Sequence, residues 1–100
     1  VAKEKEQVVG YLVCQLFSPE AELHNIAVAP SMQHRGVGKK MLHALVEKLR
    51  LSGMKKIYLL VRDSNLAAIH FYQNAGFLQV GIRPRYYENR ENALVMSLDM

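Results

Sequence analysis

The chain has 100 residues, of which 50% are hydrophobic and 22% are charged, and its formal net charge is +4 at pH 7. This length suits one small domain, so we expect residues 1–100 to form a single domain. The apolar runs are too short to span a bilayer, no secretory signal is visible, and the single Cys14 excludes an internal disulfide framework. We therefore expect a cytoplasmic protein with no membrane span, and the positive charge favours an anionic ligand.

The predicted elements, taken along the chain, begin with two strands. Residues 8–17 and 21–28 have the composition of strands, and the turn residues at 18–20 favour an antiparallel pair. Apolar residues then recur at helical spacing, which predicts an amphipathic helix over about 37–52 that ends at Gly53.

The second half of the chain adds one helix and three strands. Residues 56–61 are a continuous apolar run, which is typical of a strand covered on both faces. A capped helix over about 65–75 follows and is closed by Gly76, and residues 77–83 and 93–98 predict two further strands. Helices alternate with strands only in the middle of the chain. This order predicts an α/β (α+β) fold, with a mixed, mostly antiparallel sheet and two helices.

The segment QHRGVGKK at residues 33–40 has the glycines and lysines of a phosphate-binding loop. A nucleotide-triphosphate loop would need glycine at Gln33 and a hydroxyl side chain at Lys40, and a dinucleotide-binding loop would need a third glycine at Met41. What remains is the pattern Q-x-x-G-x-G before a basic helix, where the backbone amides of residues 34–39 can point at a pyrophosphate. A loop that only turns the chain is the alternative.

The pattern Q-x-x-G-x-G after NIAVAP, followed by SNLAAIHFYQNAGF, resembles the GNAT superfamily of acetyl-CoA-dependent N-acetyltransferases. Three segments, LHNIAVAPSMQHRGVGKKML, VRDSNLAAIHFYQNAGF and RPRYYENRENALVM, are similar to the RimI-type enzymes, which acetylate the α-amines of ribosomal proteins. The resemblance implies the GNAT fold, acetyl-CoA (coenzyme A) as cofactor and a protein or peptide N-terminus, such as that of a ribosomal protein, as acceptor. It also implies that the chain lacks the family's N-terminal strand and two helices, which form one wall of the acceptor groove. Apolar surface left bare in this way favours self-association, for example as a dimer.

The resemblance assigns the glycine loop and the strand before it to the cofactor. The residues implied to bind coenzyme A are Ile26, Ala27, Val28, His34, Arg35, Gly36, Val37, Gly38, Lys39 and Asn65. In the family, the strand that ends at Val28 splays from its parallel neighbour and leaves a slot for the pantetheine arm, and an amide near Val28 faces the thioester oxygen. Asn65 could also simply cap the second helix, and the two roles are compatible.

Tyr72 matches the family's tyrosine that protonates the departing thiolate, although packing alone is an alternative role for a tyrosine on this helix face. The family's general base, a glutamate, would stand at Leu60, which cannot accept a proton. Glu22 and His24 occupy the position that more distant GNAT enzymes use for the base, and their two-residue spacing predicts that they share one sheet face. The alternatives are an exposed strand-end charge for Glu22 and packing for His24.

Tyr86 and Tyr87, between the last two strands, match a tyrosine pair that lines the peptide entrance in the family, with a rigid hairpin pair as the alternative. We predict no metal, since the helical His43 and His70 have no second ligand at metal spacing. The competing functions are a small-molecule amine acetyltransferase and a non-catalytic module that binds acetyl-CoA or nucleic acid. We expect no nucleic acid, because the basic residues gather at the expected cofactor phosphates and not along a face with interleaved aromatic residues.

Overall fold

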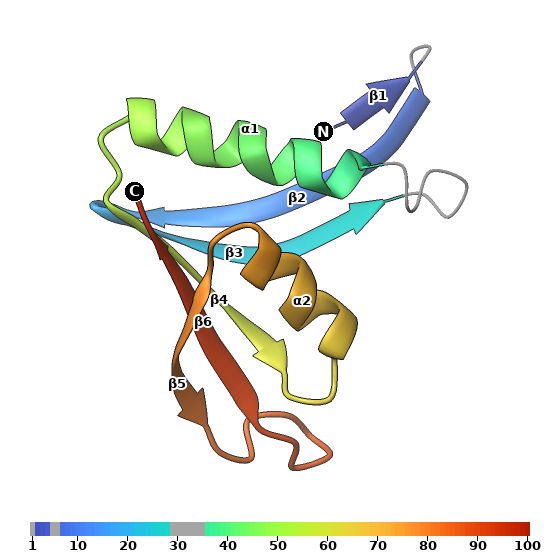
Figure 1. Ribbon diagram of the computed structural model, residues 1–100, viewed down its shortest axis with the longest axis vertical. Helices are drawn as coiled ribbons and strands as arrows, with labels where there is room; N and C mark the ends of the chain where they lie inside the picture. The colour runs from blue at the N-terminus through green and yellow to red at the C-terminus, as the bar shows by residue number, and fades with distance from the viewer. Residues whose placement is uncertain (1, 5–6, 29–35) are drawn as a thin grey trace.

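The computed structural model of the chain describes residues 2–4, 7–28 and 36–100. Its elements are β1 (Ala2–Glu4), β2 (Gln7–Phe17), β3 (Glu20–Val28), α1 (Val37–Leu51), β4 (Lys56–Arg62), α2 (Leu66–Asn74), β5 (Leu78–Arg83) and β6 (Ala93–Asp99) (Figure 1). The last seven confirm the predicted order, and each of their ends lies within one residue of the predicted end. The sequence did not predict β1, because a charged three-residue edge strand has no apolar periodicity and is held by its backbone pairing with β2.

The strands form one six-stranded sheet in the order β1-β2-β3-β4-β6-β5. Each pair of neighbours is antiparallel except β3 and β4, which are parallel because α1 carries the chain back between them (Figure 1). The predicted mixed, mostly antiparallel sheet with two helices is therefore confirmed.

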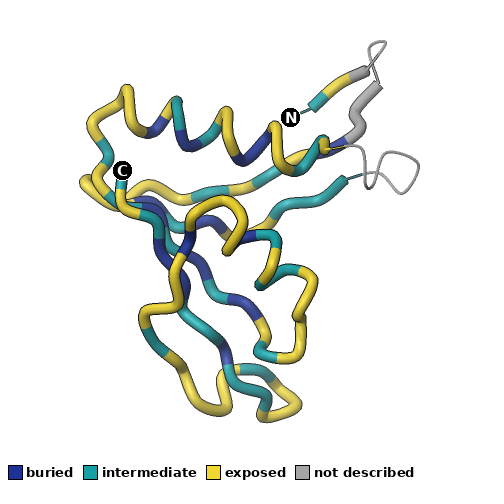
Figure 2. The backbone as a smooth tube through the Cα atoms, viewed as in Figure 1, coloured by how far each residue is buried: buried dark blue, intermediate teal, exposed yellow. Residues whose placement is uncertain are grey.

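Both helices contribute to one hydrophobic core on a single face of the sheet. The buried members of this core are Ala21, Leu23, Leu42, Val46, Leu49, Ile57, Leu59, Val61, Tyr72, Phe77 and Met96. Figure 2 shows these buried positions interrupted by partly buried ones along the strands, as the alternation of side chains in a strand requires. Neither helix in the described part of the chain combines the length and the apolarity needed to cross a membrane.

The opposite face of the sheet is less covered. The prediction that β4 is covered on both faces is wrong, because Tyr58 and Leu60 alternate with its buried residues and are partly exposed. No helix among the described residues packs on that side. On the same face, Tyr11 and Val13 of β2 are 43% and 48% exposed, respectively. This face therefore presents an apolar surface to solvent, and we call it the open face.

Candidate functional site

Strands β3 and β4 lie side by side only at their beginnings. Their parallel pairs are Glu20 with Lys56, Ala21 with Ile57, Glu22 with Tyr58, and Leu23 with Leu59, and the strands diverge beyond these pairs (Figure 1). The register between β2 and β3 shifts at His24, which is bulged between Leu23 and Asn25. A bulge bends the strand that carries it, so the carboxyl end of β3 turns away from β4. The resulting opening is the splay that the sequence resemblance implies.

Helix α1 begins at the mouth of this opening. Gly36 is its N-cap with φ +76°, and the Gly36 carbonyl accepts a hydrogen bond from the Lys40 amide at 3.0 Å. At Gly38, an added Cβ would lie 3.5 Å from Phe71 Cζ of α2 and 3.6 Å from Val28 Cγ2 of β3. The first turn of α1 thus lies close to both β3 and α2. It carries no acidic side chain and two exposed lysines, so the helix dipole and the lysines together favour an anion there.

The predicted cofactor residues fall on three segments around the opening. Gly36, Val37, Gly38 and Lys39 lie at the start of α1, Ile26, Ala27 and Val28 lie on the diverging end of β3, and Asn65 precedes α2. His34 and Arg35 lie outside the described residues. The Asn65 side chain accepts a hydrogen bond from the Ala68 amide at 3.2 Å, so its predicted capping role is confirmed. A cofactor contact at Asn65 stays a prediction.

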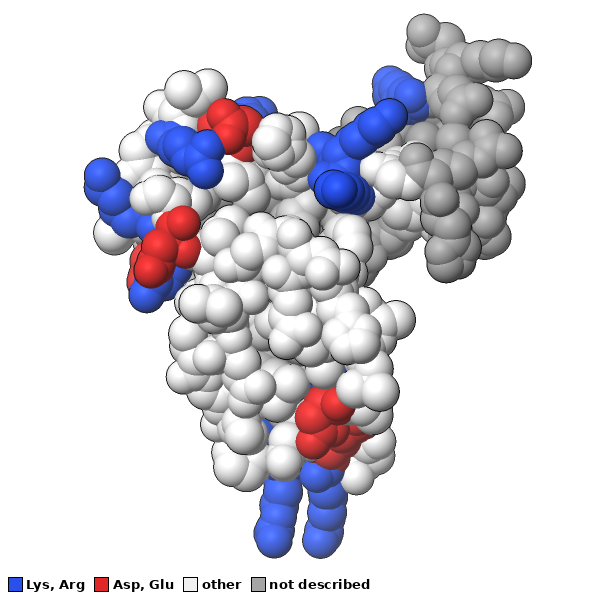
Figure 3. All heavy atoms as spheres, viewed as in Figure 1, with Lys and Arg blue, Asp and Glu red and all other residues white. Residues whose placement is uncertain are grey.

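A groove of about 520 Å³ runs between α1 and α2. Its lining residues are Lys39, Leu42, His43, Val46, Glu47, Arg50, Phe71, Asn74, Ala75 and Leu98. Figure 3 shows charged side chains gathered over α1, while the surface over α2 beneath them is uncharged. The groove therefore has charged groups of both signs on its α1 side, where Glu47 pairs with Arg50, and a largely apolar floor.

Tyr72 lies on α2, inside the helical layer, and is only 9% exposed. Its ring meets Phe71 edge-on with centroids 5.3 Å apart, and it meets Phe77 at a tilt with centroids 5.6 Å apart. Burial raises the pKa of Tyr72 above its ordinary value of 10.0, because the charged phenolate is disfavoured away from water. The hydroxyl therefore stays protonated at neutral pH, as a proton donor must.

Glu22 and His24 lie on the open face, and their predicted placement on one face is confirmed. His24 Nε2 is 3.8 Å from Glu22 Oε2 and 3.1 Å from Gln15 Oε1 of β2. The side chains of Glu22 and His24 are 21% and 43% exposed, respectively, so water can reach both groups. Tyr72 packs in the core with Leu23, whose side chain points to the opposite face of β3 from Glu22 and His24. The sheet therefore lies between this pair and Tyr72. The structure thus brings the two base candidates together but not into contact with the candidate acid.

Tyr58 lies beside this pair, and no motif in the sequence pointed to it as a site residue. Its hydroxyl lies 3.5 Å from Glu22 Oε2, because the two residues are partners in the parallel β3–β4 register. Desolvation, and then the Glu22 charge, raise the pKa of Tyr58. It is therefore protonated and can orient the carboxylate. The described residues hold no group of three or more His, Cys, Asp or Glu side chains that could hold a metal ion.

Tyr86 and Tyr87 lie in the segment between β5 and β6, with ring centroids 5.1 Å apart in an edge-on arrangement. Tyr86 is 50% exposed. The Arg62 guanidinium lies over the Tyr87 ring at 3.9 Å, which ties this segment to the end of β4. The pair is thus held beside the turn that leads into α2.

Residues 1–77 match the family described as the acetyltransferase (GNAT) family. The chain belongs to this family. The resemblance drawn from the sequence motifs is therefore confirmed. A [ribosomal protein bS18]-alanine N-acetyltransferase of Haemophilus ducreyi is 39% identical to this GNAT chain over 99 residues, which cover 95% of the chain and 68% of the relative. The protein of the same name from Haemophilus influenzae is 41% identical over 98 residues, covering 94% and 66%, respectively.

A solved structure agrees with these relatives. The crystal structure of the ribosomal-protein-S18-alanine N-acetyltransferase from Escherichia coli matches this GNAT chain with a TM-score of 0.90 at 36% identity. The match covers 97% of this chain and 64% of that chain. This GNAT chain spans about two thirds of the length of the curated relatives it matches.

Proposed function

We propose that this GNAT chain transfers the acetyl group of acetyl-CoA to the α-amine of a protein N-terminus, and that the acceptor is a ribosomal protein. The proposal is carried by the 39% and 41% identity to the two bS18-alanine N-acetyltransferases. The site supports it, since diverging strands, a glycine-capped helix start and a helix with a buried tyrosine surround one opening. Residues 1–100 act as one domain in this proposal, and the free Cys14 thiol suits a reducing cytoplasm.

The donor is held at the start of α1 and along the end of β3. The first-turn amides that follow Gly36 bind the diphosphate of acetyl-CoA, helped by the helix dipole and by Lys39. The pantetheine arm enters between the ends of β3 and β4, beside residues 26–28. Gly38 has no side chain at the point where the first turn of α1 approaches Phe71 and β3. The entrance for the pantetheine arm is therefore narrow but not blocked.

The transfer itself needs no covalent enzyme intermediate. The amine nitrogen attacks the thioester carbon, the carbon–sulfur bond breaks, and the Tyr72 hydroxyl gives its proton to the leaving sulfur. The amine must lose one proton, which passes to a base or to water. Cys14 takes no part, since it is a partly buried strand residue that packs against the core.

We expect Glu22→Gln to lower turnover at neutral pH by about tenfold or more, because glutamine keeps the shape of glutamate but cannot take a proton. Acetyl-CoA affinity should be unchanged. The measurement is a pH–rate profile of the wild type, Glu22→Gln and His24→Gln, with the exposed strand neighbour Glu20→Gln as a matched control. If His24 is the base, His24→Gln should cause the loss instead.

Three superimposable profiles would remove both residues from the mechanism. The rate of all three enzymes would then rise with pH up to the pKa of the free α-amine, about 8, and flatten above it, since solvent would take the proton. Leu60→Glu adds a test of the position at which the family carries its base. Leu60 is only partly buried, so a carboxylate there can be solvated, and the substitution should raise the rate if a base is all that is lacking.

A thiol-release assay separates the proposed reaction from its rivals. An alanine-first peptide should release coenzyme A from acetyl-CoA, and the same peptide with a blocked N-terminus should not. Release with small amines but not with the peptide would favour a small-molecule acetyltransferase. Leu60 at the usual base position favours one more candidate, a non-catalytic acetyl-CoA-binding module. That candidate predicts calorimetric binding of acetyl-CoA with no thiol release from any amine.

We expect the chain to self-associate through the open face, because Tyr11 and Val13 leave apolar surface accessible there. Light scattering across a concentration series should show a dimer or larger species for the wild type. Val13→Lys should shift it toward monomer, and Leu51→Lys, at an 86% exposed leucine of α1, should not. A wild-type monomer at high concentration would contradict this prediction.

A further inference from the structure

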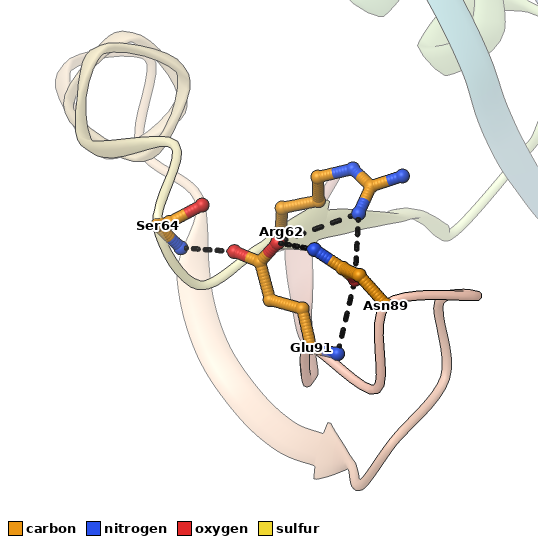
Figure 4. Close-up of polar contacts among 4 residues, drawn as sticks. All are labelled: Arg62, Ser64, Asn89 and Glu91. Carbon is orange, nitrogen blue, oxygen red and sulfur yellow. Dashed lines mark hydrogen bonds and ion pairs between the residues drawn. The ribbon is translucent and has the colours of Figure 1, made fainter.

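The segment between β5 and β6, residues 84–92, is fastened to the turn between β4 and α2 by a network of side chains (Figure 4). Arg62 Nη1 donates to Glu91 Oε2 at 3.3 Å and to Asn89 Oδ1 at 3.2 Å. The other carboxylate oxygen of Glu91 accepts a hydrogen bond from the Ser64 amide at 2.9 Å. Glu91 therefore bridges the end of β4 and the turn before α2.

Further contacts make this junction redundant. Asn89 Nδ2 donates to Glu91 Oε2 at 3.2 Å, and the Asp63 amide donates to the Asn92 carbonyl at 3.2 Å. The Glu91 side chain is only 15% exposed. Hydrogen bonds from Ser64, and then from Asn89, lower the pKa of Glu91 to about 2, so its carboxylate is charged at neutral pH. Burial, and then Glu91, raise the pKa of the adjacent Asp63.

The same arginine holds the tyrosine pair. The Arg62 guanidinium lies 3.9 Å from the centroid of the Tyr87 ring while it bonds to the Glu91 carboxylate. The Tyr87 amide also donates to the Glu91 carbonyl at 3.2 Å. Tyr86 packs edge-on against Tyr87 and keeps half of its surface exposed. Loss of either charged partner would therefore remove the side-chain contacts between the tyrosine pair and the turn before α2, and only backbone hydrogen bonds would remain.

The backbone of the segment is strained, which indicates that its shape is imposed by these contacts. Arg85 has φ 53° and Arg90 has φ 65°, in the left-handed region that favours glycine. Each is held by a hydrogen bond from its own amide, to Asn92 Oδ1 at 3.1 Å and to the Tyr87 carbonyl at 2.8 Å, respectively.

We propose that Arg62 and Glu91 are positioning residues that clamp the Tyr86–Tyr87 segment to the start of α2. The clamp fixes the tyrosines relative to the helix that carries Tyr72, so the acceptor enters in line with the proton donor. This inference rests on the proposed acetyl transfer to a protein α-amine. The residues assigned to the donor at the start of α1 and on β3 take no part in the clamp. Asn65 is held by its own hydrogen bond from the Ala68 amide, so loss of the clamp should not weaken acetyl-CoA binding.

The test compares Arg62→Met and Glu91→Ala with a matched pair of controls. Lys56 and Asp99 form an exposed ion pair, 3.7 Å apart, at the other end of the same β4–β6 pairing, so Lys56→Met and Asp99→Ala remove equivalent charges. In the thiol-release assay, each clamp variant should raise KM for an alanine-first peptide about tenfold and leave KM for acetyl-CoA and the saturated rate nearly unchanged. The control variants should match the wild type. The double clamp variant should lose no more than either single variant, because the two residues act as one unit.

Hydrogen exchange supplies a second readout. The amides of Tyr87 and Arg90 should exchange faster in the clamp variants, while those of α1 should not. An unmoved peptide KM with wild-type transfer intact would overturn the clamp alone. Equal losses for peptide and acetyl-CoA would overturn it in favour of a purely structural role. No transfer by the wild-type chain would overturn the proposed function and the inference with it.

Discussion

Replacing Tyr72 by phenylalanine is expected to lower the turnover of acetyl transfer by roughly 100-fold or more. The substitution removes one hydroxyl and keeps the ring that packs against Phe71 and Phe77. Burial holds the phenol protonated, and a departing thiolate, whose ordinary pKa is about 8.5, needs that proton to leave as a thiol. The loss should therefore fall on the chemical step.

The measurement is thiol release at saturating acetyl-CoA and peptide, with calorimetric titration of acetyl-CoA and a melting curve for the same variant. Donor affinity and melting temperature should stay at wild-type values, because no packing contact of the ring is lost. A Phe variant that turns over at the wild-type rate would reassign Tyr72 to packing. A variant that fails only in donor binding would place the hydroxyl in the donor site instead.

Replacing Gly36 by valine is expected to weaken acetyl-CoA binding at least about tenfold, which is about 1.4 kcal/mol. Gly36 stands at the N-cap of α1, where the proposed binding mode brings the diphosphate against the backbone. Apart from its chain neighbours, no atom of the described residues lies within 4 Å of an added Cβ, so the side chain would extend into the space proposed for the ligand. Its φ of +76° is also unfavourable for valine and costs on the order of 1–2 kcal/mol of stability.

The chain supplies a matched control for that strain. Gly53, after the other end of α1, has φ +85°, and in the described part of the chain only its own neighbours lie within 4 Å of an added Cβ. Gly53→Val should therefore destabilise the fold about as much as Gly36→Val and leave acetyl-CoA affinity unchanged. Calorimetric titration of both folded variants decides the matter. Equal affinities would show that the start of α1 does not hold the donor.

The regular elements could be predicted because their signals are local. The apolar stripe over residues 37–51 and the cap at Asn65 each depend only on residues close together in the sequence. The structure has both helices at the predicted positions. β1 could not be predicted, since its three residues owe their conformation to a partner strand and not to their own pattern. The one-sided coverage of β4 could not be predicted for a related reason. A run of apolar residues does not tell how many layers pack against it.

The site also contains features that are local in the sequence and features that are not. The glycine pattern and the motif around Tyr72 are contiguous, so sequence alone could locate them. The contacts of Glu22 with Tyr58 and of Arg62 with Glu91 join residues 36 and 29 positions apart, respectively. They depend on strand register, which a single sequence does not specify. The splay depends on the bulge at His24 and on the short β3–β4 pairing, and only the family resemblance anticipated it.

The most direct test of acetyl transfer to a protein N-terminus is tandem mass spectrometry of an alanine-first peptide that also contains a lysine, after incubation with the chain and acetyl-CoA. We predict one acetyl group on the α-amine of the alanine, dependent on the chain and strongly reduced in Tyr72→Phe. An unmodified peptide, or acetylation of the lysine side chain alone, would contradict the account.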